Sequence, residues 1–201
     1  MKVVVVTGGI GSGKTAACRF LTREFGWPVY YADDRVKQLY VSSLGLLDAI
    51  EKELGGVFRD ADGKFLPGEL AKVIFEDTSA LEKVESLVFP VLTDDFINWK
   101  NEQTNTQCVI LESATILEKP QLRNLADVTV IIDAPVDMRA DRAAKRDKST
   151  LENVRKRMKT QPLMNAISEG MTNVSSDYVI MNDSDMDEFH DKLRMLAEKL
   201  S

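Results

Sequence analysis

The chain has 201 residues, 44% of them hydrophobic, so it can bury a core and form one domain, or a core domain with small insertions. Its formal net charge of -6 at pH 7 disfavours nonspecific binding to nucleic acid or to anionic membranes. Cys18 and Cys108 lack metal-like spacing, and we find neither a membrane-spanning run nor a signal peptide, so we expect a cytoplasmic protein without nucleic-acid or membrane partners.

The chain opens on a pattern of strand, helix and strand. Residues 2–6 form an unalternating run of mostly β-branched residues, which is typical of a parallel strand buried on both faces. Residues 14–25 carry apolar side chains at helical spacing and stop at Gly26. Residues 29–31 then predict a second strand.

The next seventy residues have a mostly helical pattern. Ser43 is a candidate N-cap for a helix that ends near Leu54, and a short helix is expected around residues 70–74. Residues 79–99 have long helical periodicity, which Pro90 should kink or split.

The last part of the chain returns to buried strands. Apolar runs at 108–111, 128–132 and 178–181 predict three more strands, and 186–200 predicts an amphipathic helix. Strands separated by helices indicate an α/β fold with a parallel five-stranded sheet and helices on both faces.

The segment between the first strand and the first helix, Gly8 to Thr15, reads GGIGSGKT and matches the phosphate-binding pattern G-x-x-x-x-G-K-[ST]. Glycines let backbone N–H groups approach an anion at a helix N-terminus, where the macrodipole also favours negative charge. Lys14 can reach the β- and γ-phosphates of ATP, and the Thr15 hydroxyl can bind Mg²⁺. The residues predicted to hold ATP here are Gly9, Ile10, Gly11, Ser12, Gly13, Lys14, Thr15 and Ala16.

Several classes of P-loop protein can be set aside. The guanine-reading N-K-x-D element of regulatory GTPases is missing, and the D-x-x-G at 60–63 does not follow a buried strand. An LSGGQ-like element of transporter ATPases is also missing. A small P-loop kinase remains, in which a carboxylate accepts the proton of the attacking hydroxyl.

Three acidic residues follow strands at the edge where an open parallel sheet places its active site. Asp33 and Asp34 end the second strand, and Glu112 ends the third. For Asp33 we favour catalysis over a capping role, and for Asp34 we favour a helix cap. Glu112 is predicted to hold Mg²⁺ or its water, rather than to form a structural ion pair.

Residues 136–160 hold nine Lys or Arg and four acids in an otherwise acidic chain. Arg139, Arg142 and Arg146 recur at helical spacing on one face. A solvated charged face explains some of these residues, but the cluster also suits a lid that supplies positive charge over polyphosphate and excludes water. Arg142 and Arg146 are the strongest candidates for ATP contacts.

These motifs, in this order, resemble the dephospho-coenzyme A kinase family across nearly the whole chain. The resemblance is carried by TGGIGSGKT, the ADD around Asp33, Asp62-Gly63 with VIF at 73–75, ILESATILEK, Arg142 with Arg146, Gln161, and SDYVIMN at 176–182. It implies ATP-dependent phosphorylation of the ribose 3′-hydroxyl of dephospho-CoA, with Asp33 as base and Arg142 on the ATP phosphates. It also implies a P-loop core (1–33, 104–138 and 162–201), a helical acceptor-binding region (34–103) and a lid (139–161).

The chain departs from the family pattern at four places. Tyr31 stands where a first Asp is usual, Phe89 where His precedes Pro90, Pro67 where an Arg often follows the DG turn, and Glu112 where Asp is usual. Two other functions therefore stay open: a kinase for a nucleoside or nucleoside monophosphate, and a nucleotide-binding switch or scaffold without catalysis. Lys14, Thr15 and Asp33 argue against the second.

Overall fold

The computed structural model describes residues 1–200 except 44, 117–122, 162–163, 165–166 and 168–175. The chain divides into two compact units, one made of Met1–Tyr31 with Gln103–Ser201, and the other of Ala32–Glu102. The sequence-based division placed the helical acceptor-binding region at 34–103, close to the bounds of the second unit.

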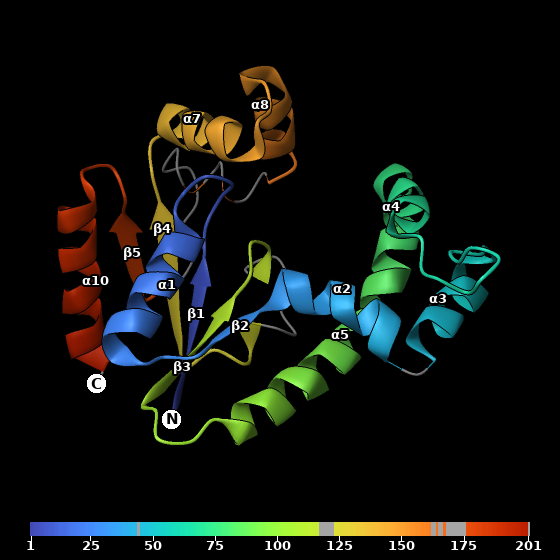
Figure 1. The fold of residues 1–201 in the computed structure, drawn as a ribbon, viewed down its shortest axis with the longest axis horizontal. Helices are drawn as coiled ribbons and strands as arrows, with labels where there is room; N and C mark the ends of the chain where they lie inside the picture. The colour runs from blue at the N-terminus through green and yellow to red at the C-terminus, as the bar shows by residue number, and fades with distance from the viewer. Residues whose placement is uncertain (44, 117–122, 162–163, 165–166, 168–175, 201) are drawn as a thin grey trace. The chain divides into compact units, whose positions relative to one another are not determined.

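The first unit is built on a parallel sheet of five strands, which confirms the predicted fold class (Figure 1). The strand order is β2-β3-β1-β4-β5, so the phosphate-loop strand lies at the centre and pairs with β3 and β4. The strands are β1 (Lys2–Thr7), β2 (Val29–Tyr31), β3 (Cys108–Glu112), β4 (Val128–Asp133) and β5 (Tyr178–Met181).

Both faces of the central strand are buried, as its unalternating sequence predicts. Val3 to Val6 are at most 3% exposed. Val4 and Val6 point into a core shared with helices α1 (Lys14–Phe25) and α10 (Met186–Leu200), which pack against each other. Burying such side chains contributes about 1.5–3 kcal/mol each, so this core fixes the sheet edge from which the phosphate loop emerges.

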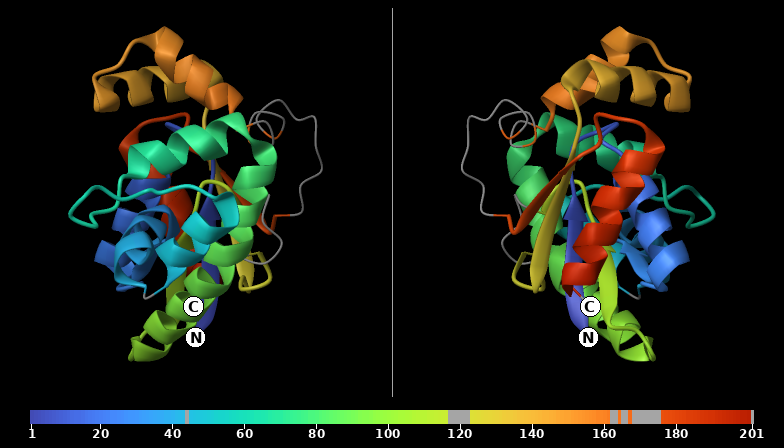
Figure 2. Two further views of the ribbon diagram at one scale, coloured as in Figure 1. Left: turned by 90° about the vertical axis from the view of Figure 1, so that its right-hand side faces the viewer. Right: turned by 90° about the vertical axis from the view of Figure 1, so that its left-hand side faces the viewer.

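Beyond the carboxyl ends of the strands lies a helical hairpin made of α7 (Val136–Asp147) and α8 (Leu151–Lys159) (Figures 1 and 2). Its apolar contacts come from Ala140, Ala143, Val154 and Met158, and Ile10 of the phosphate loop packs against them. The predicted lid, 139–161, begins inside α7.

Asp147 and Thr150 fix the turn of this hairpin. The Thr150 hydroxyl caps α8 by accepting from the Asn153 N–H at 3.2 Å. The Asp147 carboxylate accepts hydrogen bonds from Arg146 at 2.7 Å and from Arg157 at 2.7 Å. These bonds, chiefly the one from Arg146, hold the pKa of the Asp147 carboxyl below its usual range.

The second unit is helical, with α2 (Ala32–Ser42), α3 (Leu46–Leu54), α4 (Pro67–Glu76) and α5 (Thr78–Glu102). The prediction that Ser43 caps α3 is wrong. The Ser43 N–H donates to the Leu39 carbonyl at 3.0 Å and so completes α2. Gly45, at φ 81°, occupies the N-cap position of α3 instead.

Pro90 does not split the long helix, since α5 runs as one helix from Thr78 to Glu102 with Pro90 inside it. Val84 and Val88 before the proline and Leu92 and Phe96 after it are all buried at 3% exposure or less. This continuous apolar face offsets the backbone hydrogen bond that proline removes. None of the helices in the described part of the chain has the length and apolarity that a membrane crossing requires.

Candidate active site

The phosphate loop joins β1 to α1 and ends at Gly13, the N-cap residue of α1. Gly11 and Gly13 have φ values of 77° and 108°, in the region that favours glycine. The Lys14 ammonium folds back over the loop, where it donates to the Gly8 carbonyl at 2.7 Å and the Gly9 carbonyl at 3.4 Å. The helix N-terminus and this cation together suit an anionic ligand.

Side chains far along the chain hold the loop from outside. The Ile10 N–H donates to the Gln161 side-chain oxygen at 2.9 Å. The Ile10 carbonyl accepts from Arg139 at 3.1 Å, and the Ser12 carbonyl accepts from the Asn182 amide at 2.8 Å. In the sequence, Gln161 and Asn182 stood out only as parts of the family resemblance, and Arg139 only as one of several basic residues.

A cavity of about 200 Å³ opens between the loop and α7. Its lining contains eight of the ten residues predicted to contact ATP: Gly9, Gly11, Gly13, Lys14, Thr15, Ala16, Arg142 and Arg146. Ile10 and Ser12 do not line it. Ile10 packs on the α7–α8 hairpin, and Ser12 is 0% exposed.

The two arginines that α7 contributes to the cavity wall have different partners. Arg142 donates to the Asn182 backbone carbonyl at 3.0 Å, so its guanidinium is anchored to the end of β5. Arg146 pairs with Asp147, its side chain is 61% exposed, and that hydrogen bond raises the pKa of its guanidinium. Arg142 is therefore the better fixed of the two.

Two carboxylates lie at strand ends in the sheet unit. Glu112 ends β3, is 8% exposed, and lies 4.0 Å from the Lys14 ammonium. Asp133 ends β4 and lies 3.5 Å from the Arg139 guanidinium. Asp133 was missed in the sequence, although it follows the buried run at 128–132 just as Glu112 follows the third strand.

Asp33 and Asp34 lie in the first turn of α2, where carboxylates suit the helix dipole. The prediction that Asp34 caps a helix is wrong, because α2 already begins at Ala32. The Asp34 carboxylate instead accepts from Lys37 at 2.7 Å. Asp33 is exposed and follows Tyr31, the Cα partner of Glu112, by two residues.

The donor set suits Mg²⁺ bound together with phosphate. Among the described residues, no group of three or more His, Cys, Asp or Glu could hold a metal alone. The Thr15 hydroxyl and the Glu112 carboxylate are hard oxygen donors, and Mg²⁺ in nucleotide sites takes few protein ligands besides substrate phosphates. These two residues therefore fit the ion.

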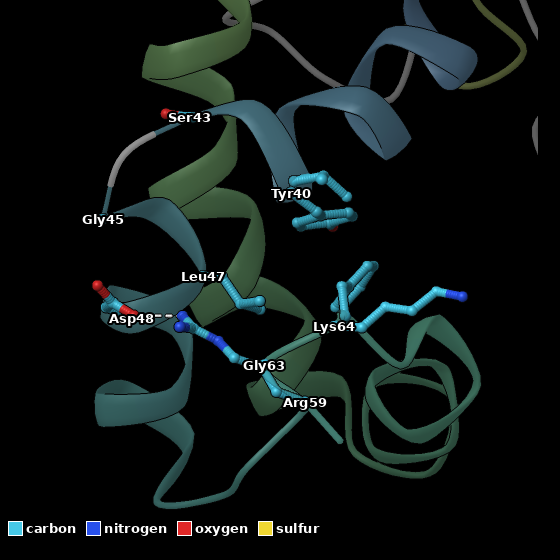
Figure 3. Close-up of a pocket in the computed structure, with 10 residues that line it drawn as sticks. Tyr40, Ser43, Gly45, Leu47, Asp48, Arg59, Gly63 and Lys64 are labelled. Atoms are coloured by element: carbon cyan, nitrogen blue, oxygen red, sulfur yellow. Dashed lines mark hydrogen bonds and ion pairs between the residues drawn. The ribbon is translucent and has the colours of Figure 1, made fainter. Parts of the chain in front are cut away.

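The helical unit has a cavity of its own, of about 370 Å³ (Figure 3). The centroids of the Tyr40 and Phe65 rings lie 5.1 Å apart. Arg59 pairs with Asp48 (Figure 3). The Lys64 side chain extends away from that pair (Figure 3). The lining residues are Tyr40, Val41, Ser43, Gly45, Leu47, Asp48, Arg59, Gly63, Lys64 and Phe65.

Comparisons with known proteins point to one family. The family model described as dephospho-CoA kinase matches residues 2–188. A dephospho-CoA kinase of Porphyromonas gingivalis is 33% identical over 182 residues, covering 90% of this chain and 86% of the relative. One from Chlorobaculum tepidum is 31% identical over 204 residues, covering 98% and 94%.

Solved structures share the fold at low sequence identity. A Thermus thermophilus protein superposes with a TM-score of 0.81 at 22% identity, covering 100% of this chain and 98% of that one. A shikimate kinase from Acinetobacter baumannii has a TM-score of 0.52 at 16% identity, covering 100% and 93%. These likenesses establish the P-loop kinase fold.

Proposed function

The chain belongs to the dephospho-CoA kinase family, and on that premise we propose that it transfers the γ-phosphoryl group of ATP to the ribose 3′-hydroxyl of dephospho-CoA. The products are ADP and CoA, and the reaction is the last step of CoA biosynthesis. The observation that carries the proposal is the cavity at the start of α1, which Lys14, Thr15 and Arg142 line together.

The loop and two cations position the donor in this proposal. Backbone amides at the start of α1 bind the phosphates of ATP, and Lys14 stabilises the charge that develops on the transferred group. Arg142, anchored on the Asn182 carbonyl, approaches the same phosphates from α7. Thr15 and Glu112 would hold Mg²⁺ or its water, and the ion would neutralise negative charge on the phosphates.

Asp33 is the proposed base. Its side chain is exposed at the start of α2, directly after the strand whose last residue pairs with Glu112. A carboxylate there can accept the proton of the attacking hydroxyl as the new O–P bond forms. In-line transfer then requires only positioning and charge stabilisation from the rest of the site.

We assign the cavity of the helical unit to the elongated arm of dephospho-CoA. Its apolar wall around Tyr40 and Phe65 suits a flexible chain with methyl groups, and Lys64 suits a phosphate. Tyr40→Ala and Lys64→Ala should raise the KM for the acceptor and leave the KM for ATP unchanged. Lys72→Ala, at an exposed ion pair on α4, is the matched control.

The experiment that tests the function is an acceptor panel with coupled detection of ADP. Dephospho-CoA should exceed adenosine and nucleoside monophosphates in kcat/KM by about a hundredfold or more, since its arm has contacts that the others lack. The 3′-deoxy analogue of dephospho-CoA should bind without being phosphorylated. A preference for a nucleoside monophosphate would rule out dephospho-CoA as the acceptor. A rate of ADP formation that no acceptor changes would rule out the kinase reaction.

A further inference from the structure

Arg139 is a fully buried cation in direct contact with the phosphate loop. Its side chain is 0% exposed, its Nε donates to the Ile10 carbonyl at 3.1 Å, and its Nη1 lies 3.5 Å from the Asp133 carboxylate. A Cβ on Gly9 would lie 1.8 Å from its Nη2, so the guanidinium rests directly against the Gly9 backbone. Arg139 thus occupies the back of the loop, on the side away from solvent.

This contact fixes the direction of an amide. In a trans peptide the C=O of one residue and the N–H of the next point to opposite sides, and the described chain contains no cis peptide bond. Because Arg139 holds the Ile10 carbonyl, the Gly11 N–H points the other way. Gly11 lines the cavity, and its N–H has no acceptor among the described residues.

Asn182 fixes the direction of a second amide in the loop, in the peptide between Ser12 and Gly13. Its side-chain amide donates to the Ser12 carbonyl at 2.8 Å, which turns the Gly13 N–H to the opposite side. Gly13 also lines the cavity. Buried side chains from outside the loop therefore hold two of its peptides, Ile10–Gly11 and Ser12–Gly13. The N–H of each peptide points away from the side chain that holds it and can bind an anion.

Burying a charged guanidinium at this position costs desolvation free energy. Burial lowers the pKa of Arg139, and the nearby Asp133 carboxylate raises it again. A buried cation that lies 3.5 Å from a carboxylate gains little net stability from that ion pair. A neutral side chain could fill the space, so the directed donor to Ile10 is the feature that distinguishes arginine here.

We propose that Arg139, supported by Asp133, is a positioning residue for phosphoryl transfer that holds the Ile10–Gly11 peptide with its N–H directed at the nucleotide phosphates. Arg139 acts through the loop and does not itself touch the substrate. The inference rests on the proposed nucleotide site, but not on the identity of the acceptor. Its test therefore measures phosphate binding without any acceptor present.

Arg139→Met keeps an unbranched apolar side chain and removes the guanidinium donor. Titration calorimetry should show ATP and inorganic tripolyphosphate binding about tenfold to a hundredfold more weakly than to the wild type, as loss of a charge-assisted hydrogen bond predicts. In turnover, the KM for ATP should rise while the KM for the acceptor stays constant. Arg139→Lys should recover part of the affinity, and Lys145→Met, at an exposed position of α7, should change nothing.

A purely structural role predicts another pattern. Arg139→Met leaves the Asp133 carboxylate buried without the Arg139 cation, which can destabilise the fold. If this single variant unfolds, the double variant Asp133→Asn/Arg139→Met replaces it, because both side chains are then neutral. Unchanged tripolyphosphate affinity in either folded variant overturns the proposal. Equal weakening of tripolyphosphate and dephospho-CoA binding also overturns it, because that result indicates general damage. If the wild type itself binds no tripolyphosphate, the nucleotide site has failed, and the positioning role fails with it.

Discussion

The Lys14 ammonium lies 4.0 Å from the Glu112 carboxylate, with side chains only 12% and 10% exposed. The sheet brings them together, since Glu112 is the Cα partner of Val6 in β1, and Lys14 opens the helix that follows β1. The proposed phosphate-binding cation and the proposed metal-binding carboxylate thus lie side by side.

Replacing the carboxylate should separate metal binding from nucleotide binding. Glu112→Gln should lower kcat by about tenfold to a hundredfold and raise the Mg²⁺ concentration needed for half-maximal activity. ATP binding in EDTA should stay constant or tighten, because a negative charge beside Lys14 is removed. Activity titrations with Mg²⁺ and calorimetry in EDTA measure the two effects. A Mg²⁺ curve identical to the wild type would rule out the metal role.

The proposed base has a neighbour that serves as a control. Asp33→Asn should fold and bind ATP normally but lose about 10²- to 10⁴-fold in kcat, since the proton acceptor is gone. Asp34→Asn removes a carboxylate that pairs with Lys37, and should keep near wild-type turnover. Comparable kcat for the Asp33 variant and the wild type would refute the assignment.

Arg142 should matter to catalysis more than the exposed arginines of the hairpin. Arg142→Met removes a cation from the cavity wall, and we expect kcat to fall by about a hundredfold with a higher KM for ATP. Arg155→Met breaks an exposed ion pair with Asp137 on the same hairpin and is the control. Steady-state kinetics at varied ATP measures both. Equal effects from the two substitutions would indicate general loss of positive charge instead.

The hairpin turn should make stability depend on acid pH. The folded pKa of Asp147 lies below its unfolded value of about 3.9, so its contribution is fully present above about pH 5 and is lost as the pH falls. Asp147→Asn should lower Tm slightly at pH 7, and the difference from the wild type should shrink in acid. Thermal unfolding from pH 7 downward tests this. A difference that grows in acid would contradict the sign.

Both cysteines should resist modification in the native protein. Cys18 and Cys108 are 0% exposed, and burial raises the pKa of each thiol. A thiol reagent at pH 8 should therefore react with neither until denaturant is added, and then with both. Rapid reaction of one thiol under native conditions would show that the sheet core opens locally.

The fold was largely readable from the sequence because its strongest signals are local. Residues 3–6 are apolar on both sides of the strand, and glycines with Lys14 and Thr15 follow closely, so strand, loop and helix are marked within the first fifteen residues. The strands around 109 and 130 carry the same continuous burial pattern. Their parallel pairing around the first strand follows from the helices between them.

The supports of the loop could not be read in the same way. Arg139, Gln161 and Asn182 meet Ile10 and Ser12 only after the sheet has brought distant segments together, and no local pattern separates them from other polar residues. The two capping predictions failed for a related reason. Ser43 and Asp34 have the right chemistry for caps, but the neighbouring backbone sets where each helix begins.

The close packing around the loop glycines means that selection for folding alone can be told apart from selection for function. A Cβ at Gly8 would lie 2.1 Å from the Ile132 carbonyl oxygen, and one at Gly11 would lie 2.1 Å from that of Arg139. Packing alone thus forbids side chains there, with or without a substrate. In a mutational scan that selects only for folded protein, Gly8 and Gly11 should tolerate substitution as poorly as in a scan that selects for growth. Thr15 should be intolerant of substitution only in the scan that selects for growth.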